Sequence, residues 1–261
     1  MDKFISLNAN LQALILGCFT FTLTMLGSLM VFFIRKTNKT LISFLLALSA
    51  GIMIASAVFS LIIPSIEQSE LLYKNSYLIP TIGVLIGGFF VVIGDILLNK
   101  LLSKKETFNG ISKRNSLLFF AIALHNIPEG MCIGVAVAGA VTGSSVAISG
   151  AIMLAVGIGI QNFPEGASVS LPLLADNVSR KKAFLLGTLS GIVEPIFAVL
   201  ACLFALTISQ ILPFLLAFSA GAMICVACTE LISEASAYNK NLASAGLLIG
   251  FFIMMLLDLM L

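Results

Sequence analysis

Residues Ala121–Gly130 read AIALHNIPEG, and further along the chain Gly157–Gly166 read GIGIQNFPEG. Each copy places an asparagine and a glutamate, preceded by a histidine or a glutamine, inside a long apolar segment, and HNIPEG and QNFPEG share four of their six residues. Polar and ionisable side chains are expensive inside a membrane, so they mark functional positions there. The two copies predict a duplicated polar site within a helical membrane protein.

The composition of the whole chain agrees with this prediction. Of its 261 residues, 59% are hydrophobic and only 10% are charged, whereas a soluble domain carries roughly 25% charged residues. The net charge of +2 provides no strong basic field that would attract nucleic acid. Composition therefore excludes a soluble enzyme, a disordered chain and a nucleic-acid binder. The five cysteines lie in apolar stretches, and their odd number argues against a disulfide framework.

Apolar stretches of sufficient length recur along the chain, since a bilayer core is crossed by about 20 helical residues. There are eight, at approximately 11–34, 41–63, 77–98, 116–142, 146–174, 183–208, 211–229 and 242–261. We therefore predict an all-α membrane protein, with residues 1–261 forming a single transmembrane domain of eight helices.

Positive charge indicates the orientation of these spans. The connectors after spans one, three, five and seven hold 12 of the 14 Lys and Arg residues, and the other side holds only Lys3 and Lys74. Basic loops stay preferentially in the cytoplasm. This distribution predicts that both termini face outside.

A second repeat links spans two and seven. Ser49–Ile54 reads SAGIMI in span two, and Ser219–Ile224 reads SAGAMI in span seven. An even and an odd span run in opposite directions, so both repeats are inverted, as in secondary transporters whose sites lie near the membrane midplane. Chance similarity between helices rich in Gly and Ala explains this second repeat equally well.

The polar residues of spans four to six are predicted to form one layer at mid-membrane. Their distances from the cytoplasmic span ends put His125 level with Glu165, and Glu129 level with Gln161. The layer comprises His125, Asn126, Glu129, Gln161, Asn162, Glu165 and Glu194. Clustered carboxylates repel one another, and a divalent cation relieves that repulsion. Imidazole, carboxylate and amide oxygens suit zinc, iron and other first-row metals. Interhelical hydrogen bonding without a metal is the simpler alternative.

Prolines accompany this layer. Pro128, Pro164 and Pro195 each follow or lie among the polar residues. A proline inside a helix removes a backbone hydrogen bond and kinks the helix, and irregular backbone is tolerated in a membrane where it lines a cavity. We therefore expect kinks in spans four, five and six beside the polar layer, where they can open a polar cavity.

The paired phrases HNIPEG and QNFPEG resemble the signature of the ZIP (Zrt/Irt-like) metal transporters. SAGIMIASAVFSLIIPSIE in span two and LAFSAGAMICVACTELISE in span seven are similar to the bacterial GufA-like branch. The resemblance covers the whole chain. It implies a first metal position made by His125, Glu129, Gln161 and Glu165, and a second made by Asn126, Glu129, Asn162, Glu165 and Glu194. It further implies uptake toward the cytoplasm, by movement of spans one, four, five and six against the other four, and a homodimer.

Two features depart from the family pattern. Asn162 stands where some members have aspartate, so the second position has one negative charge fewer. Many members carry a histidine-rich cytoplasmic loop, whereas His125 is the only histidine of this chain. Metal sensing by such a loop is therefore not expected here.

The sequence predicts a transporter rather than an enzyme, with divalent metal ions as its substrate and the lipid bilayer as its surroundings. Zinc is the first expectation, with iron, manganese and cadmium as further substrates and the bacterial inner membrane as the location. A proton-coupled carrier or channel for other cations is one alternative. An intramembrane metalloenzyme is another, although a single histidine and no HExxH argue against it. Glu230, Glu234 and Asp95 are left without an assigned role.

Overall fold

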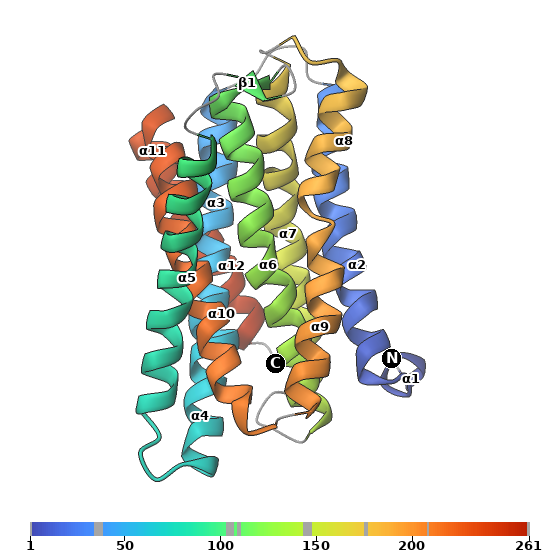
Figure 1. The fold of residues 1–261 in the computed structure, drawn as a ribbon, viewed down its shortest axis with the longest axis vertical. Coiled ribbons are helices and arrows are strands. Elements are labelled where there is room, and N and C mark those ends of the chain that lie inside the picture. Colours follow the sequence, from blue (N-terminus) through green and yellow to red (C-terminus); the bar gives the residue numbers. More distant parts are fainter. Residues whose placement is uncertain are drawn as a thin grey trace.

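A computed structural model describes residues 2–33, 39–102, 107–108, 111–142, 148–174, 177–207 and 209–259. Nearly all of this part is helical, and the helices run along one long axis (Figure 1). The only strands in the described ranges are β1 (Thr107–Phe108) and β2 (Ile111–Ser112), which pair antiparallel. The predicted all-α class is therefore confirmed.

The helices follow one another with short connections. They are α1 (Asp2–Ile5), α2 (Ala9–Ser28), η1 (Leu29–Phe32), α3 (Lys39–Ser56), η2 (Ala57–Ile62), α4 (Ile63–Leu72), α5 (Leu78–Leu102), α6 (Lys113–Val141), α7 (Ile148–Leu173), α8 (Arg180–Ser190), α9 (Val193–Thr207), η3 (Ser209–Ile211), α10 (Leu212–Val226), η4 (Ala227–Ile232), α11 (Ser233–Tyr238) and α12 (Lys240–Leu259). η1 and η3 are 3₁₀-helices, and η2 and η4 are π-helices.

Six segments of the described chain are long and apolar enough to cross a membrane. They are Ala9–Phe32, Ser43–Leu72, Leu78–Leu97, Arg180–Thr207, Leu212–Tyr238 and Lys240–Leu259. α6 and α7 have 29 and 26 residues, and the repeated polar residues interrupt their apolar runs. These two helices lie in the middle of the bundle (Figure 1). The chain is thus a multi-pass membrane protein, and the count of eight spans, which would include α6 and α7, stays a prediction.

The second sequence repeat is a structural repeat. α3 passes into the π-helix η2 at Ala57, and α10 passes into the π-helix η4 at Ala227, at the same register after the repeated serines Ser49 and Ser219. The packing partners correspond as well. α3 packs against α12 and α7, while α10 packs against α5 and α6. Chance similarity does not produce a shared backbone irregularity at the same register, so we assign the two halves as an inverted repeat.

Two serine hydrogen bonds connect the repeated helices at their opposite ends. Ser43 Oγ donates to the carbonyl of Ala235 at 2.7 Å, and Ser65 Oγ donates to the carbonyl of Pro213 at 2.6 Å. In the alignment of the two halves, Ser43 corresponds to Pro213, and Ser65 corresponds to Ala235. The two bonds are therefore equivalent under the repeat, with donor and acceptor exchanged.

The helices of spans two and seven extend beyond the predicted apolar spans. We predicted spans that end near 63 and 229, and the helices continue to Leu72 and Tyr238. Hydropathy marks the part of a helix that lies in hydrocarbon. It does not mark where the backbone stops being helical, and both of these helices extend as polar ends beyond their apolar parts.

Of the three prolines beside the polar layer, only Pro195 lies next to a break in the helix. α6 continues through Pro128, and α7 continues through Pro164. In span six, α8 ends at Ser190 and α9 begins at Val193. Proline is tolerated in the first helical turn, and Pro195 occupies that turn of α9. Span six is therefore a broken helix, and Glu194 lies at the break.

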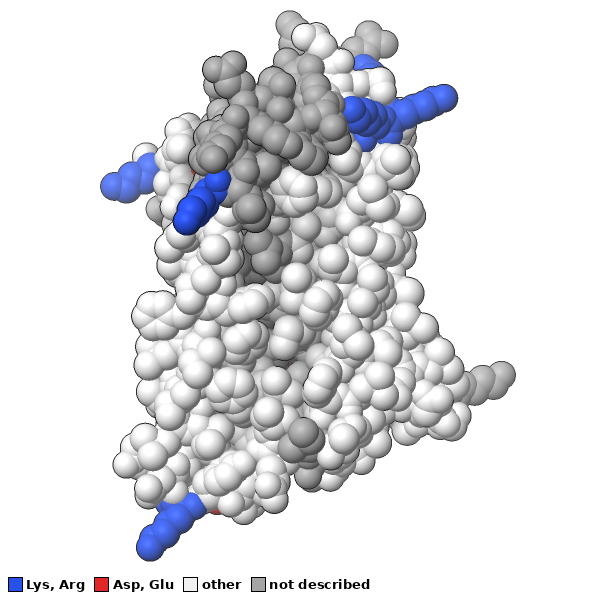
Figure 2. Space-filling model, in the orientation of Figure 1, with Lys and Arg blue, Asp and Glu red and all other residues white. Residues whose placement is uncertain are grey.

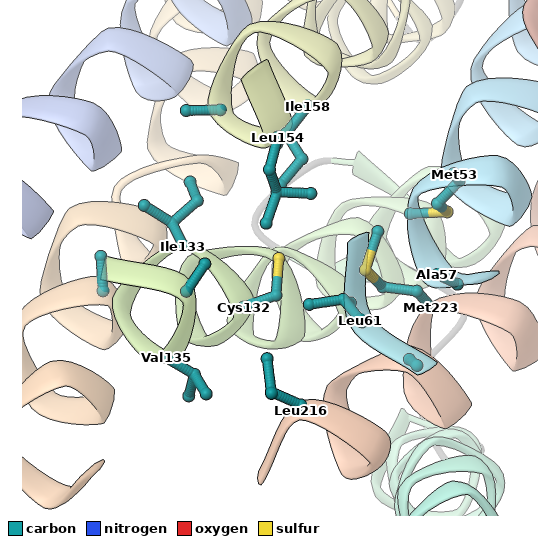
Figure 3. Packing of buried hydrophobic residues seen from close by; sticks show 14 of the residues in the cluster. Met53, Ala57, Leu61, Cys132, Ile133, Val135, Leu154, Ile158, Leu216 and Met223 are labelled. Atoms are coloured by element: carbon teal, nitrogen blue, oxygen red, sulfur yellow. The ribbon is translucent and has the colours of Figure 1, made fainter. Parts of the chain in front are cut away.

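An apolar cluster fills the bundle beside the polar residues. Around α6 in Figure 3, side chains from α3 and η2, α7 and α10 converge on Cys132 and Ile133. Cys132 follows Glu129 by three residues and Ile158 precedes Gln161 by three, and both are fully buried. The cluster therefore closes the polar layer on the side of the α6–α7 connection.

Charge is distributed unequally between the two ends of the molecule. In Figure 2, Lys and Arg side chains are concentrated at the end where α8 begins, and a single one protrudes at the end where α4 stops. Lys74 follows α4, whereas Arg180, Lys181 and Lys182 begin α8. Most of the basic side chains that the structure describes thus lie at the end of the bundle where α8 begins.

Candidate metal centre

Antiparallel packing of α6 and α7 brings the two sequence copies together. Gln161 Nε2 donates to Glu129 Oε1 at 2.6 Å, and both side chains are fully buried. The prediction that Glu129 and Gln161 lie at one level is therefore confirmed. A carboxylate only accepts hydrogen bonds, so the amide nitrogen of Gln161 faces Glu129 and its oxygen Oε1 remains available.

A second amide–carboxylate pair lies beside the first. Asn162 Nδ2 donates to Glu194 Oε2 at 2.7 Å, linking α7 to the start of α9. Thr24 on α2 donates from Oγ1 to the other oxygen, Glu194 Oε1, at 3.1 Å. Both oxygens of Glu194 therefore accept a hydrogen bond, from two different helices.

Asn126 and Glu165 complete the buried layer. Asn126 Nδ2 donates to the carbonyl of Ser190, the last residue of α8, at 3.0 Å. Glu165 is fully buried and lies within electrostatic reach of Glu129 and Glu194. His125 lies on α6 next to Asn126, but its side chain falls outside the described residues.

Close backbone contact holds these helices around the layer. A Cβ atom on Gly130 would lie 2.4 Å from the carbonyl oxygen of Glu194, and one on Gly166 would lie 2.0 Å from that of Thr24. Only glycine permits such an approach. α6 is thereby pressed against α9, and α7 against α2, directly beside the two glutamates of the repeated motifs.

Several oxygens of the layer are buried without a hydrogen-bond donor. Within the described part of the chain they include Glu129 Oε2, Gln161 Oε1, Asn126 Oδ1 and Asn162 Oδ1. A buried acceptor without a partner costs about 1–3 kcal/mol, and three carboxylates in one dry layer repel one another. Cation binding would satisfy these oxygens and offset that repulsion.

The described carboxylates are not placed to hold a metal ion by themselves. Among the side chains that the structure describes, no three of the His, Cys, Asp and Glu types are placed to hold a metal ion together. The amide side chains of Gln161 and Asn162 bond directly to Glu129 and Glu194, and Asn126 lies in the same layer. Mixed carboxylate and amide ligation is the donor set that this arrangement offers.

Sequence reasoning missed Thr24. Thr24 lies in an apolar span with no charged neighbour, so nothing local distinguishes it. Extending the second repeat backwards from Ser49 and Ser219 would have found it, because that alignment pairs Thr24 with Glu194. In span six Pro195 predicted a kink, and the structure has a break in the helix at 191–192, where Gly191 caps α8.

Residues of undecided role lie away from this layer. Glu234 accepts a hydrogen bond from the hydroxyl of Tyr238 at 3.2 Å, and Glu230 lies in η4. Asp95 and Glu230 both lie within electrostatic reach of Cys225. All five cysteines are free thiols in the structure, which agrees with the prediction that they form no disulfide framework.

The fold and site define a class: a multi-pass helical membrane protein with an oxygen-lined polar layer buried inside an inverted repeat. The family model for the ZIP Zinc transporter matches residues 102–258. Zinc transporter ZIP11 of Xenopus tropicalis is 32% identical, over 95% of this chain and 96% of the relative. Zinc transporter GufA of Myxococcus xanthus is 34% identical over 77% of this chain and 80% of the relative. Zinc transporter ZupT of Streptococcus mutans serotype c is 31% identical over 88% and 90%.

The chain belongs to the ZIP family. The resemblance to this family and to its GufA-like relatives, found from the paired motifs, is confirmed. The protein is accordingly a metal-ion transporter and not an enzyme, which removes the metalloenzyme alternative.

Proposed function

We propose that this protein carries zinc ions across the membrane into the cytoplasm through a site for two metal ions. One observation supports this most directly. The fully buried pairs Glu129–Gln161 and Asn162–Glu194 leave unpaired oxygens in one layer. The relatives described above are named as zinc transporters, so zinc is the first substrate to test, followed by iron, manganese and cadmium.

The two pairs correspond to the two metal positions of the family pattern. His125, Glu129, Gln161 and Glu165 would bind the first ion. Asn126, Glu129, Asn162, Glu165 and Glu194 would bind the second, with Glu129 and Glu165 shared. The first position offers the unpaired oxygens Glu129 Oε2 and Gln161 Oε1. In the second, Glu194 already accepts two hydrogen bonds, so the second ion should bind more weakly.

The proposal also covers the direction of transport and the oligomeric state of the protein. Basic connectors mark the cytoplasmic side, and they gather at the end where α8 begins (Figure 2). We place the termini and the apolar cluster around Cys132 toward the outside. In this conformation that cluster closes the outer path, and opening it would require α6 and α7 to move. We further propose a homodimer in the bacterial inner membrane.

Uptake into liposomes is the test of function. Purified protein is reconstituted with an entrapped zinc-sensitive dye, and external zinc, iron, manganese or cadmium is added. We expect zinc uptake by the wild-type protein and none by Glu165→Gln. Proton-coupled transport would be recognised by pH changes that accompany metal entry. Absence of metal uptake by a folded, correctly inserted protein would overturn the proposal.

Orientation is tested separately by labelling. Lys74→Cys should react with a membrane-impermeant maleimide on intact cells, whereas Lys182→Cys should react only after permeabilisation. The test is made in a background where the exposed Cys18 and Cys228 are serine. Labelling of position 182 but not of position 74 on intact cells would reverse the assigned direction.

A further inference from the structure

The inverted repeat continues into the polar layer itself. Thr24 and Glu194 are 170 residues apart, the same interval that separates the π-helices η2 and η4. Their surroundings correspond too, because Gly166 of α7 packs on the carbonyl of Thr24 and Gly130 of α6 packs on that of Glu194. Gly130 and Gly166 are themselves the equivalent last residues of HNIPEG and QNFPEG. Thr24 therefore occupies the place in α2 that Glu194 occupies in α9.

The two asparagines obey the same symmetry. Asn126 donates to the carbonyl of Ser190 at 3.0 Å, and Asn162 makes a longer contact to the carbonyl of Thr20 at 3.5 Å. Thr20 corresponds to Ser190 in the alignment that pairs Thr24 with Glu194. The shared glutamates of the two motifs also correspond. A pseudo-two-fold axis thus passes through the layer.

Among the positions of this layer, equivalent side chains differ at two places. His125 corresponds to Gln161, and Glu194 corresponds to Thr24. The second difference places a carboxylate on one side of the axis and a hydroxyl on the other. The two groups meet across the axis, where Thr24 Oγ1 donates to Glu194 Oε1 at 3.1 Å.

We propose that Thr24 is a positioning residue of Glu194, and that this pair determines where the second metal ion binds. The inference rests on the proposed two-metal function. The hydroxyl of Thr24 is 3.4 Å from the carbonyl of Thr20 but 3.1 Å from the carboxylate. A hydroxyl has one proton, and the bond to a charged acceptor is the stronger. The hydroxyl of Thr24 therefore donates to Oε1 of Glu194 and fixes the orientation of this oxygen.

The consequence concerns the free lone pairs of Glu194. Asn162 Nδ2 holds Oε2 at 2.7 Å, and its own Oδ1 is buried without a donor in the described part of the chain. When a metal ion binds, Asn162 can rotate its amide to offer Oδ1. The carboxylate of Glu194 then loses the donor on Oε2. The hydroxyls of α2 remain, and Thr24, which donates to Oε1, keeps Glu194 aimed at the ion, with Thr20 on the preceding turn beside it.

Three variants of one helix test this role. Thr24→Val keeps the shape of the side chain and removes the donor, and Thr24→Ser keeps the donor. Thr22→Val is the matched control, because Thr22 is on the same helix and its hydroxyl donates to the carbonyl of Cys18, away from the layer. Zinc is titrated into each purified protein by calorimetry, and bound zinc is counted by mass spectrometry.

We expect two zinc ions per wild-type chain. Loss of an outer-shell partner typically weakens metal binding by about 10–100-fold, so Thr24→Val should weaken the second ion by about tenfold. The first ion should keep its affinity, and Thr24→Ser and Thr22→Val should behave as the wild type. A loss of both ions in Thr24→Val would indicate a merely structural role and overturn the inference, as would an unchanged second affinity.

Exchange of the two side chains gives a second, independent test. Glu194→Thr alone should bind one zinc ion. Combining it with Thr24→Glu moves the carboxylate across the pseudo-two-fold axis, where a hydroxyl at position 194 can donate to it. The double variant should regain a second zinc ion. A folded double variant, as judged by its thermal transition, that binds only one would contradict the inference. A wild-type protein that binds fewer than two ions would instead overturn the proposed two-metal function.

Discussion

The two halves of the inverted repeat, residues 9–102 and 180–259, agree in their packing and differ in their polar side chains. Both have a π-helix at the same register, and two equivalent hydrogen bonds join them, in which Ser43 and Ser65 of the first half donate to the carbonyls of Ala235 and Pro213 in the second. Thr24 in the first half, however, corresponds to Glu194 in the second. Conserving the backbone while varying the polar groups lets one scaffold surround an asymmetric site.

A second difference lies near the ends of the bundle. Ser60 Oγ in η2 donates to Asp258 Oδ1 of α12 at 2.7 Å. The residue that corresponds to Ser60 in the second half is Glu230, in η4, which shares its surroundings with Asp95 of α5. One half thus pairs a hydroxyl with a carboxylate, and the other has two carboxylates within electrostatic reach of Cys225. These two carboxylates lie toward the end with the basic connectors, since Asp95 is in the last turns of α5, close to Lys100 in sequence.

The largest expected effect tests the part of the site that both sequence copies share. Glu129→Gln and Glu165→Gln should each reduce zinc uptake by more than about 100-fold, beyond the usual loss for an outer-shell partner. The two effects should be equal, because each glutamate would contact both ions. Glu67→Gln, on the exposed face of α4, is the control. Normal uptake by either site variant would contradict the ligand assignment.

Substitution of the two contact glycines tests whether the packing is equivalent in both halves. In Gly130→Ala and Gly166→Ala the new Cβ meets backbone, and overpacking of this kind costs about 1–3 kcal/mol. Both variants should therefore have a lower thermal transition than the wild type. Gly88→Ala is the control, because its Cβ would be 3.6 Å from the nearest backbone oxygen. A large difference between the two site variants would show that the halves are packed differently.

Asn162→Asp tests how the charge of the second metal position affects the stability of the protein and the binding of the second ion. Without metal it replaces a 2.7 Å hydrogen bond by two facing carboxylates, which should lower stability. With metal it adds one negative charge to the second position, and we expect about tenfold tighter binding, or ~1.4 kcal/mol. Thermal transitions with and without zinc measure both effects. Equal shifts in the two conditions would refute the charge argument.

The smallest expected effect concerns the paired serine bonds. Interhelical hydrogen bonds in membrane proteins contribute about 0.6 kcal/mol on average, so Ser43→Ala and Ser65→Ala should each lower stability by about that amount. Their effects should match, because the two bonds are equivalent under the repeat. Ser244→Ala, whose hydroxyl bonds the carbonyl of Lys240 in its own helix, is the comparison. Unfolding equilibria in mixed micelles would reveal any inequality.

The sequence was sufficient to predict much of this architecture. Helix length and hydropathy depend on local composition, and the motif pair predicted that Glu129 and Gln161 meet. The π-helices and the continuation to Leu72 and Tyr238 could not be predicted, because backbone hydrogen-bond register depends on packing. Thr24 was missed because its role arises from a contact with a residue far away in the chain.

The matched π-helices also bear on the evolutionary origin of the inverted repeat. A π-turn holds one residue more than an α-turn, with hydrogen bonds from i to i+5. A π-turn therefore records an insertion, and such insertions are rare and local. η2 and η4 have the same register within their halves and the same length of six residues. Duplication of one ancestral half that already held this extra residue would account for both π-helices, and the different side chains at positions 24 and 194 would then be later changes.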